Sequence, residues 1–217
     1  MRLILAGGGE GKDSKPLDKL LLSLIQPKKI LYVPLARKKQ SFPKCKEWFS
    51  STFANLNFDM LTNTKKKNLS QYGGMYIGGG NTFHLLSQLR KTELKTIIDY
   101  FLENNKPIYG GSAGAIIFGK DIRTAALGKD SDINEVKLRN FSGLNLAKGY
   151  AIQCHYEPNQ DSELKRFSKQ TKLEVIALSE RSGILVENKT IHAIGYDPVY
   201  VFSRMGKKKY KSNSTFK

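Results

Sequence analysis

The chain has 217 residues, and its 36 Lys and Arg against 19 Asp and Glu give a formal net charge of +17. Hydrophobic residues make up 40% of the chain, which is enough for a folded core and argues against intrinsic disorder. No apolar stretch approaches the ~20 residues of a membrane-spanning helix, and the apolar run at residues 1–6 is too short for a signal peptide. We therefore expect a soluble cytoplasmic protein with no membrane partner.

The cysteines and the charge exclude further classes. Cys45 and Cys154 are too few for a disulfide framework or a cysteine-rich zinc site, so we expect no metal. The net charge suggests a nucleic-acid partner, but lysine dominates it, and the eight arginines, which read bases and phosphates better, form no cluster. We expect a solvated lysine-rich surface and no nucleic-acid partner, with polyanion binding as a minor alternative.

Short apolar runs alternate with amphipathic segments along most of the chain. These runs are continuous, which is typical of strands covered by helices on both faces. Strands are expected at residues 3–6, 30–33, 58–61, 75–77, 107–109, 151–154 and 175–178, and helices at residues 17–25, 45–56, 82–89, 94–103 and 162–170. This order predicts an α/β fold with a mainly parallel sheet and helices on both faces.

The pattern changes after Glu180. Residues 184–186 and 191–194 are expected to form a hairpin, and residues 199–202 a final strand. We expect one α/β hydrolytic domain over residues 1–205, since there is no internal repeat and no linker rich in Pro, Gly or Ser. Residues 206–217 are expected to be a frayed basic tail.

Two of three glycine clusters do not fit a nucleotide site. The segment Gly7-Gly8-Gly9-Glu10-Gly11-Lys12 has lysine where a dinucleotide fingerprint needs its third glycine, and it lacks the Ser or Thr of a P-loop. The segment Gly78-Gly79-Gly80-Asn81-Thr82 is followed by Phe83 where that third glycine should stand. Nucleotide binding is therefore not predicted.

The third cluster has the pattern of a nucleophile turn. Gly110-Gly111-Ser112-Ala113-Gly114 follows an expected strand and precedes an apolar helical run, with G-x-S-x-G at the corner. Glycines on both sides allow a sharp turn that lifts a serine hydroxyl above the sheet, beside backbone donors for an oxyanion. We interpret Ser112 as a nucleophile.

A serine nucleophile needs a base, and the chain has three histidines. His84 lies on an expected helix and His192 inside a late strand, so both are expected to be structural. His155 ends the strand at 151–154, at the same sheet edge as Ser112, and is the expected general base. Cys154 points to the opposite side of that strand and is not expected to act with it.

The third member should be a carboxylate that orients the imidazole. Glu180 follows the strand at 175–178 and so arrives at a strand end. Asp130 and Asp132 lie in a polar loop after the nucleophile turn. Spacing alone does not separate these candidates.

With these residues the chain resembles peptidase family S51, which contains peptidase E, the aspartyl dipeptidases and their relative cyanophycinase, with a class I glutamine amidotransferase-like fold. The resemblance rests on the Ile77–Phe83 motif, on the Ser112 motif 34 residues after Gly78, and on His155. It extends through Ile122-Arg123-Thr124 and the segment at 178–180, and so covers most of the chain.

The resemblance implies a role for each matching residue. Ser112 would be the nucleophile and His155 the base, while Gly79 or Gly80 and Ala113 would donate backbone N–H groups to the oxyanion. Asn81 would orient the loop or the substrate. Glu180 matches a family glutamate and becomes the preferred third member, with Asp130 or Asp132 in reserve.

The chain departs from the family pattern at two places. Peptidase E has an aspartate shortly after the Ile-Arg-Thr stretch, whereas this chain has Ala125-Ala126-Leu127. The aspartyl dipeptidases carry an arginine early in the helix after the histidine, whereas this helix begins Gln160-Asp161-Ser162-Glu163. Arg123 and Arg181 are the nearby candidates for binding a substrate carboxylate.

The expected function is a serine-type exopeptidase or dipeptidase that acts on small peptides through an acyl-enzyme. We expect a monomer or homodimer that needs no cofactor. The alternative is a catalytically inactive, amidotransferase-like binding or regulatory module.

Overall fold

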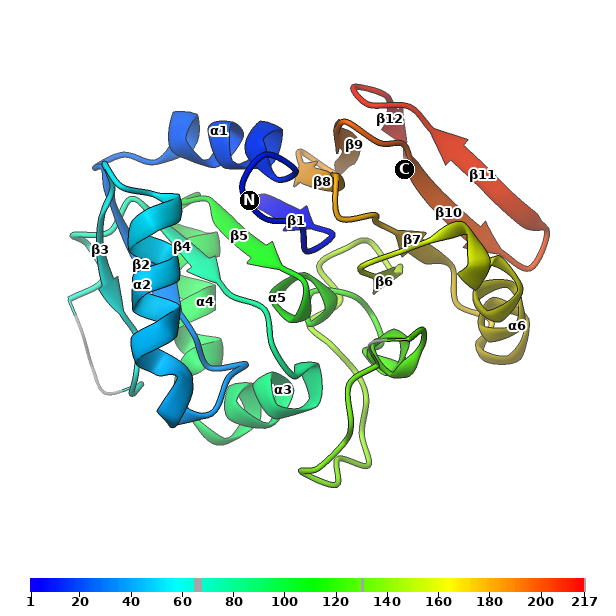
Figure 1. The fold of residues 1–217 in the computed structure, drawn as a ribbon, viewed down its shortest axis with the longest axis horizontal. Helices are drawn as coiled ribbons and strands as arrows, with labels where there is room; N and C mark the ends of the chain where they lie inside the picture. The colour runs from blue at the N-terminus through cyan, green and yellow to red at the C-terminus, as the bar shows by residue number, and fades with distance from the viewer. Residues whose placement is uncertain (65–67, 130, 217) are drawn as a thin grey trace.

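The structure is a computed structural model that describes residues 1–64, 68–129 and 131–216. Two β-sheets lie side by side with helices packed on them (Figure 1). In the described residues, the larger sheet has eight strands in the order β12-β9-β8-β1-β5-β4-β2-β3, and the smaller has four in the order β11-β10-β7-β6. No helix in this part of the chain has the length and apolarity needed to cross a bilayer.

The larger sheet has a parallel and an antiparallel part. The parallel strands are β1 (Arg2–Ala6), β5 (Ile108–Gly111), β4 (Gly74–Ile77), β2 (Lys29–Val33) and β3 (Asn57–Met60). The antiparallel strands are β8 (Ser182–Glu187), β9 (Thr190–Gly195) and β12 (Thr215–Phe216). The predicted hairpin is confirmed, and its two turn residues Asn188 and Lys189 both have positive φ, as a tight hairpin turn requires.

Helices cover both faces of the larger sheet because side chains alternate along each strand. Leu3 and Leu5 of β1 pack into one core, and Ile4 and Ala6 into the other. The first core is covered by α3 (Thr82–Lys91), α4 (Leu94–Glu103) and α5 (Ala113–Ile116). The second is covered by α1 (Lys15–Leu24) and α2 (Phe42–Thr52), and Figure 1 shows α2 in front of the strands. The predicted α/β fold is confirmed.

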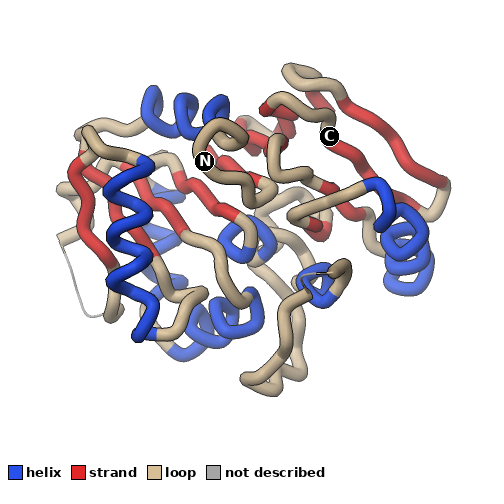
Figure 2. Tube along the Cα trace, in the orientation of Figure 1, coloured by secondary structure: helices blue, strands red, loops and turns tan. Residues whose placement is uncertain are grey.

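The sequence pattern did not predict that some of the strands form a second, smaller sheet. It contains β6 (Ala151–Gln153), β7 (Val175–Ala177), β10 (Val199–Ser203) and β11 (Gly206–Tyr210). Helix α6 (Asp161–Thr171) packs on it through Leu164 and Phe167. A long segment that is mostly loop, with a short 3₁₀ helix at Arg123–Ala126, joins α5 to β6 (Figure 2).

The expectation of a frayed basic tail is wrong. Strand β11 pairs with β10, and β12 pairs with β9, so the last described residues belong to both sheets. The rings of Tyr210 and Phe216 stack with centroids 4.2 Å apart. Lys207 lies 4.1 Å from the centroid of the Tyr200 ring, and its ammonium is 2.9 Å from an Asp161 oxygen. The extent of the hydrolytic domain, residues 1–205, stays a prediction.

Candidate active site

Ser112 lies at the junction of β5 and α5, at the carboxyl end of the parallel strands. Its φ of 51° and ψ of −115° are strained for a residue with a side chain. The flanking glycines make the turn possible, because a Cβ on Gly110 would overlap the Gly114 carbonyl, and a Cβ on Gly114 the Ile77 carbonyl. The local geometry is that of the sharp strand-to-helix turn expected from the sequence.

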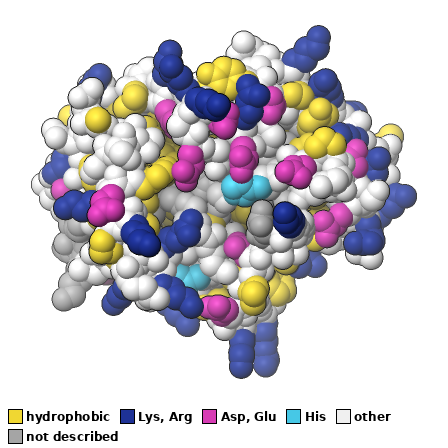
Figure 3. Space-filling view, in the orientation of Figure 1, with side chains coloured by type: hydrophobic (Ala, Val, Ile, Leu, Met, Phe, Trp, Pro, Cys, Tyr) yellow, Lys and Arg dark blue, Asp and Glu magenta, His cyan; other side chains and the backbone are white. Residues whose placement is uncertain are grey.

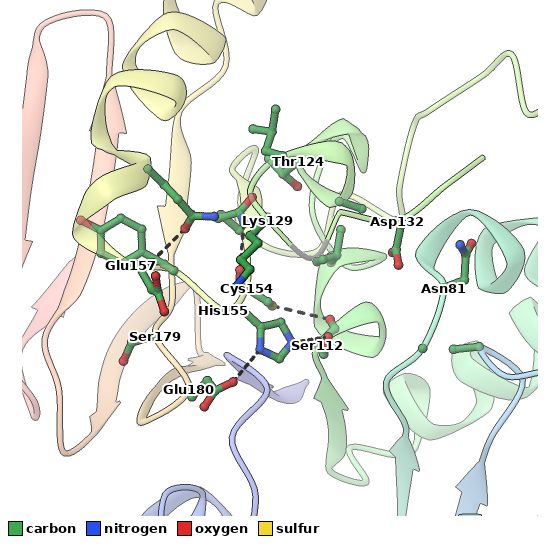
Figure 4. Close-up of a pocket in the computed structure, with 18 of the residues that line it drawn as sticks. Asn81, Ser112, Thr124, Lys129, Asp132, Cys154, His155, Glu157, Ser179 and Glu180 are labelled. Atoms are coloured by element: carbon green, nitrogen blue, oxygen red, sulfur yellow. Dashed lines mark hydrogen bonds and ion pairs between the residues drawn. The ribbon is translucent and has the colours of Figure 1, made fainter. Parts of the chain in front are cut away.

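His155 and Glu180 reach this serine from the smaller sheet. His155 follows β6, and its Nε2 is 2.9 Å from the Ser112 Oγ. Glu180 follows β7, and its Oε1 is 3.1 Å from the His155 Nδ1. Figure 4 shows the three side chains in one line, joined by dashed contacts. The structure thus brings together the predicted nucleophile, base and preferred carboxylate.

The first glycine cluster forms the joint between the two sheets at this site. The His155 N–H donates to the Gly7 carbonyl at 2.8 Å. A Cβ on Gly8 would overlap the His155 ring, and a Cβ on Gly9 the Glu180 carbonyl. Sequence reasoning tested this cluster only as a phosphate site and missed this role. The available signal was a run of glycines directly after a strand of the sheet that carries Ser112.

Three backbone N–H groups beside Ser112 have no acceptor among the described residues. They belong to the predicted oxyanion donors Gly79, Gly80 and Ala113. Gly79 is the closer glycine, since a Cβ built on it would lie 3.2 Å from the Ser112 Cβ. Unpaired donors next to a nucleophile are what stabilisation of an oxyanion requires.

The reserve carboxylate Asp132 has no contact with His155 among the described residues. One oxygen of Asp132 accepts the Thr82 N–H at 2.7 Å, at the start of α3. Figure 4 shows Asp132 beside Asn81 and apart from the Ser112–His155–Glu180 line. Asp130 lies outside the described residues.

Asn81 holds the loop that carries the glycines. Its Oδ1 accepts the His84 N–H and its Nδ2 donates to the Ile133 carbonyl, both at 2.8 Å. Both ends of the amide are therefore engaged, which favours orientation of the loop over contact with substrate.

His192 and Cys154 have structural surroundings. The His192 ring contacts the hydroxyls of Thr190 and Thr215 at 2.9 and 3.0 Å. The Cys154 thiol points to the Ala6 and Ser112 carbonyls, and burial raises its pKa. Within the described part of the chain, no group of three or more His, Cys, Asp or Glu side chains is placed to bind a metal ion.

A cleft of about 1150 Å³, here called the polar cleft, opens in front of Ser112 and His155. Among the described residues, its charged lining consists of five acids, Asp13, Asp132, Glu157, Glu180 and Asp197, and four cations, Arg37, Lys38, Lys129 and Arg181. Figure 3 shows acidic side chains grouped around a histidine near the centre of this face, with lysines and arginines scattered over the rest. The excess positive charge of the chain is thus not concentrated at the site.

The two candidate arginines differ in position. Arg123 makes a bidentate contact with Asp121, with its closest N···O distance at 2.8 Å, and it is not among the described residues that line the polar cleft. Its guanidinium is therefore already paired with a carboxylate. Arg181 does line the cleft, 3.5 Å from an Asp13 oxygen and beside the Tyr196 ring. The geometry favours Arg181 over Arg123 for contact with a substrate.

Comparison with known proteins matches residues 3–194 to the model of peptidase family S51. The chain belongs to this family. A peptidase E from Shewanella sp. (strain ANA-3) is 31% identical over 139 residues, which are 59% of this chain and 56% of that protein. A peptidase E from Nostoc sp. (strain PCC 7120) is 26% identical over 193 residues, 81% of this chain and 76% of that protein. The chain thus spans little more than half the length of the Shewanella relative.

Two solved structures share the fold. A peptidase E candidate from Listeria monocytogenes EGD-e has a TM-score of 0.68 at 23% identity, over 89% of this chain and 98% of that one. A peptidase from an acI-B1 Actinobacterium has a TM-score of 0.75 at 16% identity, over 99% of this chain and 96% of that one. The expected family and fold are confirmed.

Proposed function

We propose that this member of family S51 is a serine exopeptidase that hydrolyses dipeptides or other short peptides through an acyl-enzyme. The observation that carries the proposal is the hydrogen-bonded line from Ser112 through His155 to Glu180. This order of hydroxyl, imidazole and carboxylate converts a weakly reactive serine into a nucleophile at neutral pH.

In the proposed reaction, the Ser112 hydroxyl attacks the peptide carbonyl while the His155 Nε2 takes its proton. The Nδ1–H of His155 donates to Glu180, which holds the ring in that tautomer. His155 then passes the proton to the leaving amine, and a water deprotonated by the same nitrogen releases the acyl group. The N–H groups of Gly79 or Gly80 and of Ala113 stabilise the oxyanion. Apart from the peptide and the water, the groups that act in this scheme belong to the protein, so the proposed chemistry requires no cofactor.

The polar cleft is the proposed site for the charged ends of the peptide. Arg181 and Lys129 line it and supply positive charge for a substrate carboxylate. Strict cleavage after aspartate is not part of the proposal, because α6 begins with Asp161 and carries no arginine in its first turn.

The test combines turnover of a dipeptide library with fluorophosphonate labelling. Ser112→Ala should lose both, with turnover reduced by about 10⁴-fold or more. Ser41→Ala, which changes another serine of the same cleft, should keep both. A folded wild-type protein that neither takes up the label nor cleaves any dipeptide would contradict the proposal and favour the inactive amidotransferase-like module.

A further inference from the structure

Three tyrosines form a row across neighbouring strands, on the face of the larger sheet that α1 and α2 cover. Tyr32 of β2 pairs in register with Tyr76 of β4, which pairs with Tyr109 of β5. The rings of Tyr76 and Tyr109 stack with centroids 4.5 Å apart, and Tyr32 meets Tyr76 edge-on at 5.8 Å. The row is buried in the core under α1 and α2.

The positions that follow the row carry no side chain. Residues two apart on a strand share a face, so Gly78 lies beyond Tyr76, and Gly111 beyond Tyr109. A Cβ on Gly78 would be 3.1 Å from the Tyr32 hydroxyl, and one on Gly111 would be 3.3 Å from the Tyr76 hydroxyl. The tyrosine hydroxyls therefore lie close to the backbone of Gly78 and Gly111, at the edge of the nucleophile turn.

Beside these hydroxyls lies a pocket of about 520 Å³, here called the tyrosine pocket. The three tyrosines lie at its base, and α2 adds Cys45 and Trp48 as a wall. Ser112, His155 and Gly79 also line it, so it opens directly onto the reacting hydroxyl. Charged side chains that line it include Glu10, Arg37 and Lys44.

The two hollows beside Ser112 differ in the side chains that line them. Among the described residues, the polar cleft is lined by five acids and four cations, whereas the tyrosine pocket is lined by four aromatic rings, five glycines and one thiol, with three charged side chains. Its volume lies within the range of small-molecule sites, and aromatic walls stabilise apolar groups by burial and ring stacking. One bound peptide can therefore place a charged end in one hollow and a side chain in the other.

We propose that the tyrosine pocket binds a large apolar or aromatic side chain of a residue next to the scissile bond. The inference rests on the proposed function and narrows its substrates to short peptides that carry such a residue. Replacing that side chain by hydrogen should lower kcat/KM by about 10- to 100-fold, as expected when a buried apolar contact is lost.

The turnover test uses two dipeptide series, Xaa-Ala and Ala-Xaa, with Xaa as Gly, Ala, Leu, Phe or Trp. In one series kcat/KM should rise with the size of Xaa. Cys45→Trp fills the pocket and should remove most of this rise while sparing the Gly peptides. Lys46→Trp is the matched control, because Lys46 is an exposed neighbour on α2 outside the pocket lining.

Alkylation of the native thiol is a second way to fill the pocket, without any change that could prevent folding. Cys154 is 2% exposed, so N-ethylmaleimide should react with Cys45 in the folded protein. The modified enzyme should lose its preference for Phe and Leu peptides and keep its turnover of Gly peptides. The Cys45→Ala variant treated in the same way should keep the preference.

A binding measurement on the Ser112→Ala variant separates this inference from the proposed function. N-acetylphenylalaninamide should slow alkylation of Cys45, and N-acetylglycinamide should not. Protection without any turnover by wild type would support the pocket and contradict the peptidase. Cleavage that ignores the size of Xaa, with no protection of Cys45, would overturn the pocket and leave the peptidase standing.

Discussion

The two sheets contribute different kinds of structure to one site. The larger sheet supplies Ser112 and the glycine donors from tight turns, where Ala113 is only 1% exposed. The smaller sheet supplies His155 and Glu180 from strand-end loops, and their side chains are 43% and 58% exposed. Ser112 is thus fixed by buried backbone, whereas the side chains of His155 and Glu180 are partly exposed to solvent.

The difference shows where the geometry of the site is vulnerable. The positions of His155 and Glu180 depend on the backbone against which their loops pack. That backbone is the joint formed by Gly7, Gly8 and Gly9. Changes at this joint should impair catalysis more than changes that remove a charge from the exposed side.

Among the variants that test this difference between the sheets, the largest effect is expected from Gly8→Ala. The new Cβ would overlap the His155 ring, and Gly8 has a φ of 111°, which L-residues rarely adopt. Because a displacement of about 1 Å costs on the order of 10²-fold in rate, kcat should fall by about 10²- to 10³-fold. Steady-state kinetics with the best dipeptide measures this change, and circular dichroism checks the fold.

Gly11→Ala is the matched control in the same segment. Gly11 also has a positive φ, 58°, but a Cβ there meets no atom within 4 Å. It should cost about 1 kcal/mol of stability and leave kcat unchanged. Equal losses of kcat in both variants would show that backbone strain, and not contact with His155, is responsible.

A smaller loss is expected from Glu180→Gln. The buried aspartate of a serine protease is worth about 10⁴-fold in kcat, but an exposed carboxylate is partly replaced by water. We expect a fall in kcat of about 10- to 100-fold with little change in KM. Asp132→Asn, at the former reserve position, should change kcat less; the opposite ranking would assign the orienting role to Asp132.

A substitution at Asp18 tests the larger sheet alone, and the measured quantity is the free energy of unfolding. Burial raises the pKa of Asp18 from 3.8 to about 6, and hydrogen bonds from Ser14 and Tyr109 oppose this shift. The folded state therefore binds the Asp18 proton more tightly than the unfolded state, so this contribution to stability is present below pH 4 and lost as pH rises through 6. Asp18→Asn should gain about 3 kcal/mol over wild type above pH 6 and nothing below pH 4.

Urea unfolding of wild type and Asp18→Asn across this pH range measures the difference. The rate of fluorophosphonate labelling should be the same in both proteins at neutral pH, because Asp18 touches neither catalytic loop. A gain that grows as the pH falls would reverse the expected sign and contradict the assignment.

The smallest effect is expected from Arg181→Gln. Arg181 is half-exposed at the edge of the polar cleft, where a single ion pair contributes about 0.2–1 kcal/mol. KM for a free dipeptide should rise about two- to fivefold with kcat unchanged. KM for the corresponding dipeptide amide should not change, and an equal rise for the amide would exclude contact with the carboxylate.

The parts of the site that local sequence dictates could be predicted. The turn around Ser112 needs glycines at fixed positions, and His155 stands directly after an apolar strand. Glu180 could not be separated from Asp132 by spacing, because the choice depends on β6 and β7 pairing in a sheet of their own. Only the resemblance to family S51 favoured Glu180 beforehand.

Features that depend on contacts between residues far apart along the chain could not be predicted from the sequence. The contacts of Gly8 and Gly9 come from His155 and Glu180, which are far along the chain. Strand β11 contains three consecutive lysines, so no apolar alternation marks it. Its register with β10 and the ring beneath Lys207 stabilise it instead.

The order in which the chain visits the two sheets has a mechanical consequence. The chain crosses from one sheet to the other after β5, after β7, after β9 and again after β11. Any movement of one sheet relative to the other must therefore be accommodated in all four of these connections at once. The four connections thus constrain the distance between Ser112, which the larger sheet carries, and His155, which the smaller sheet carries.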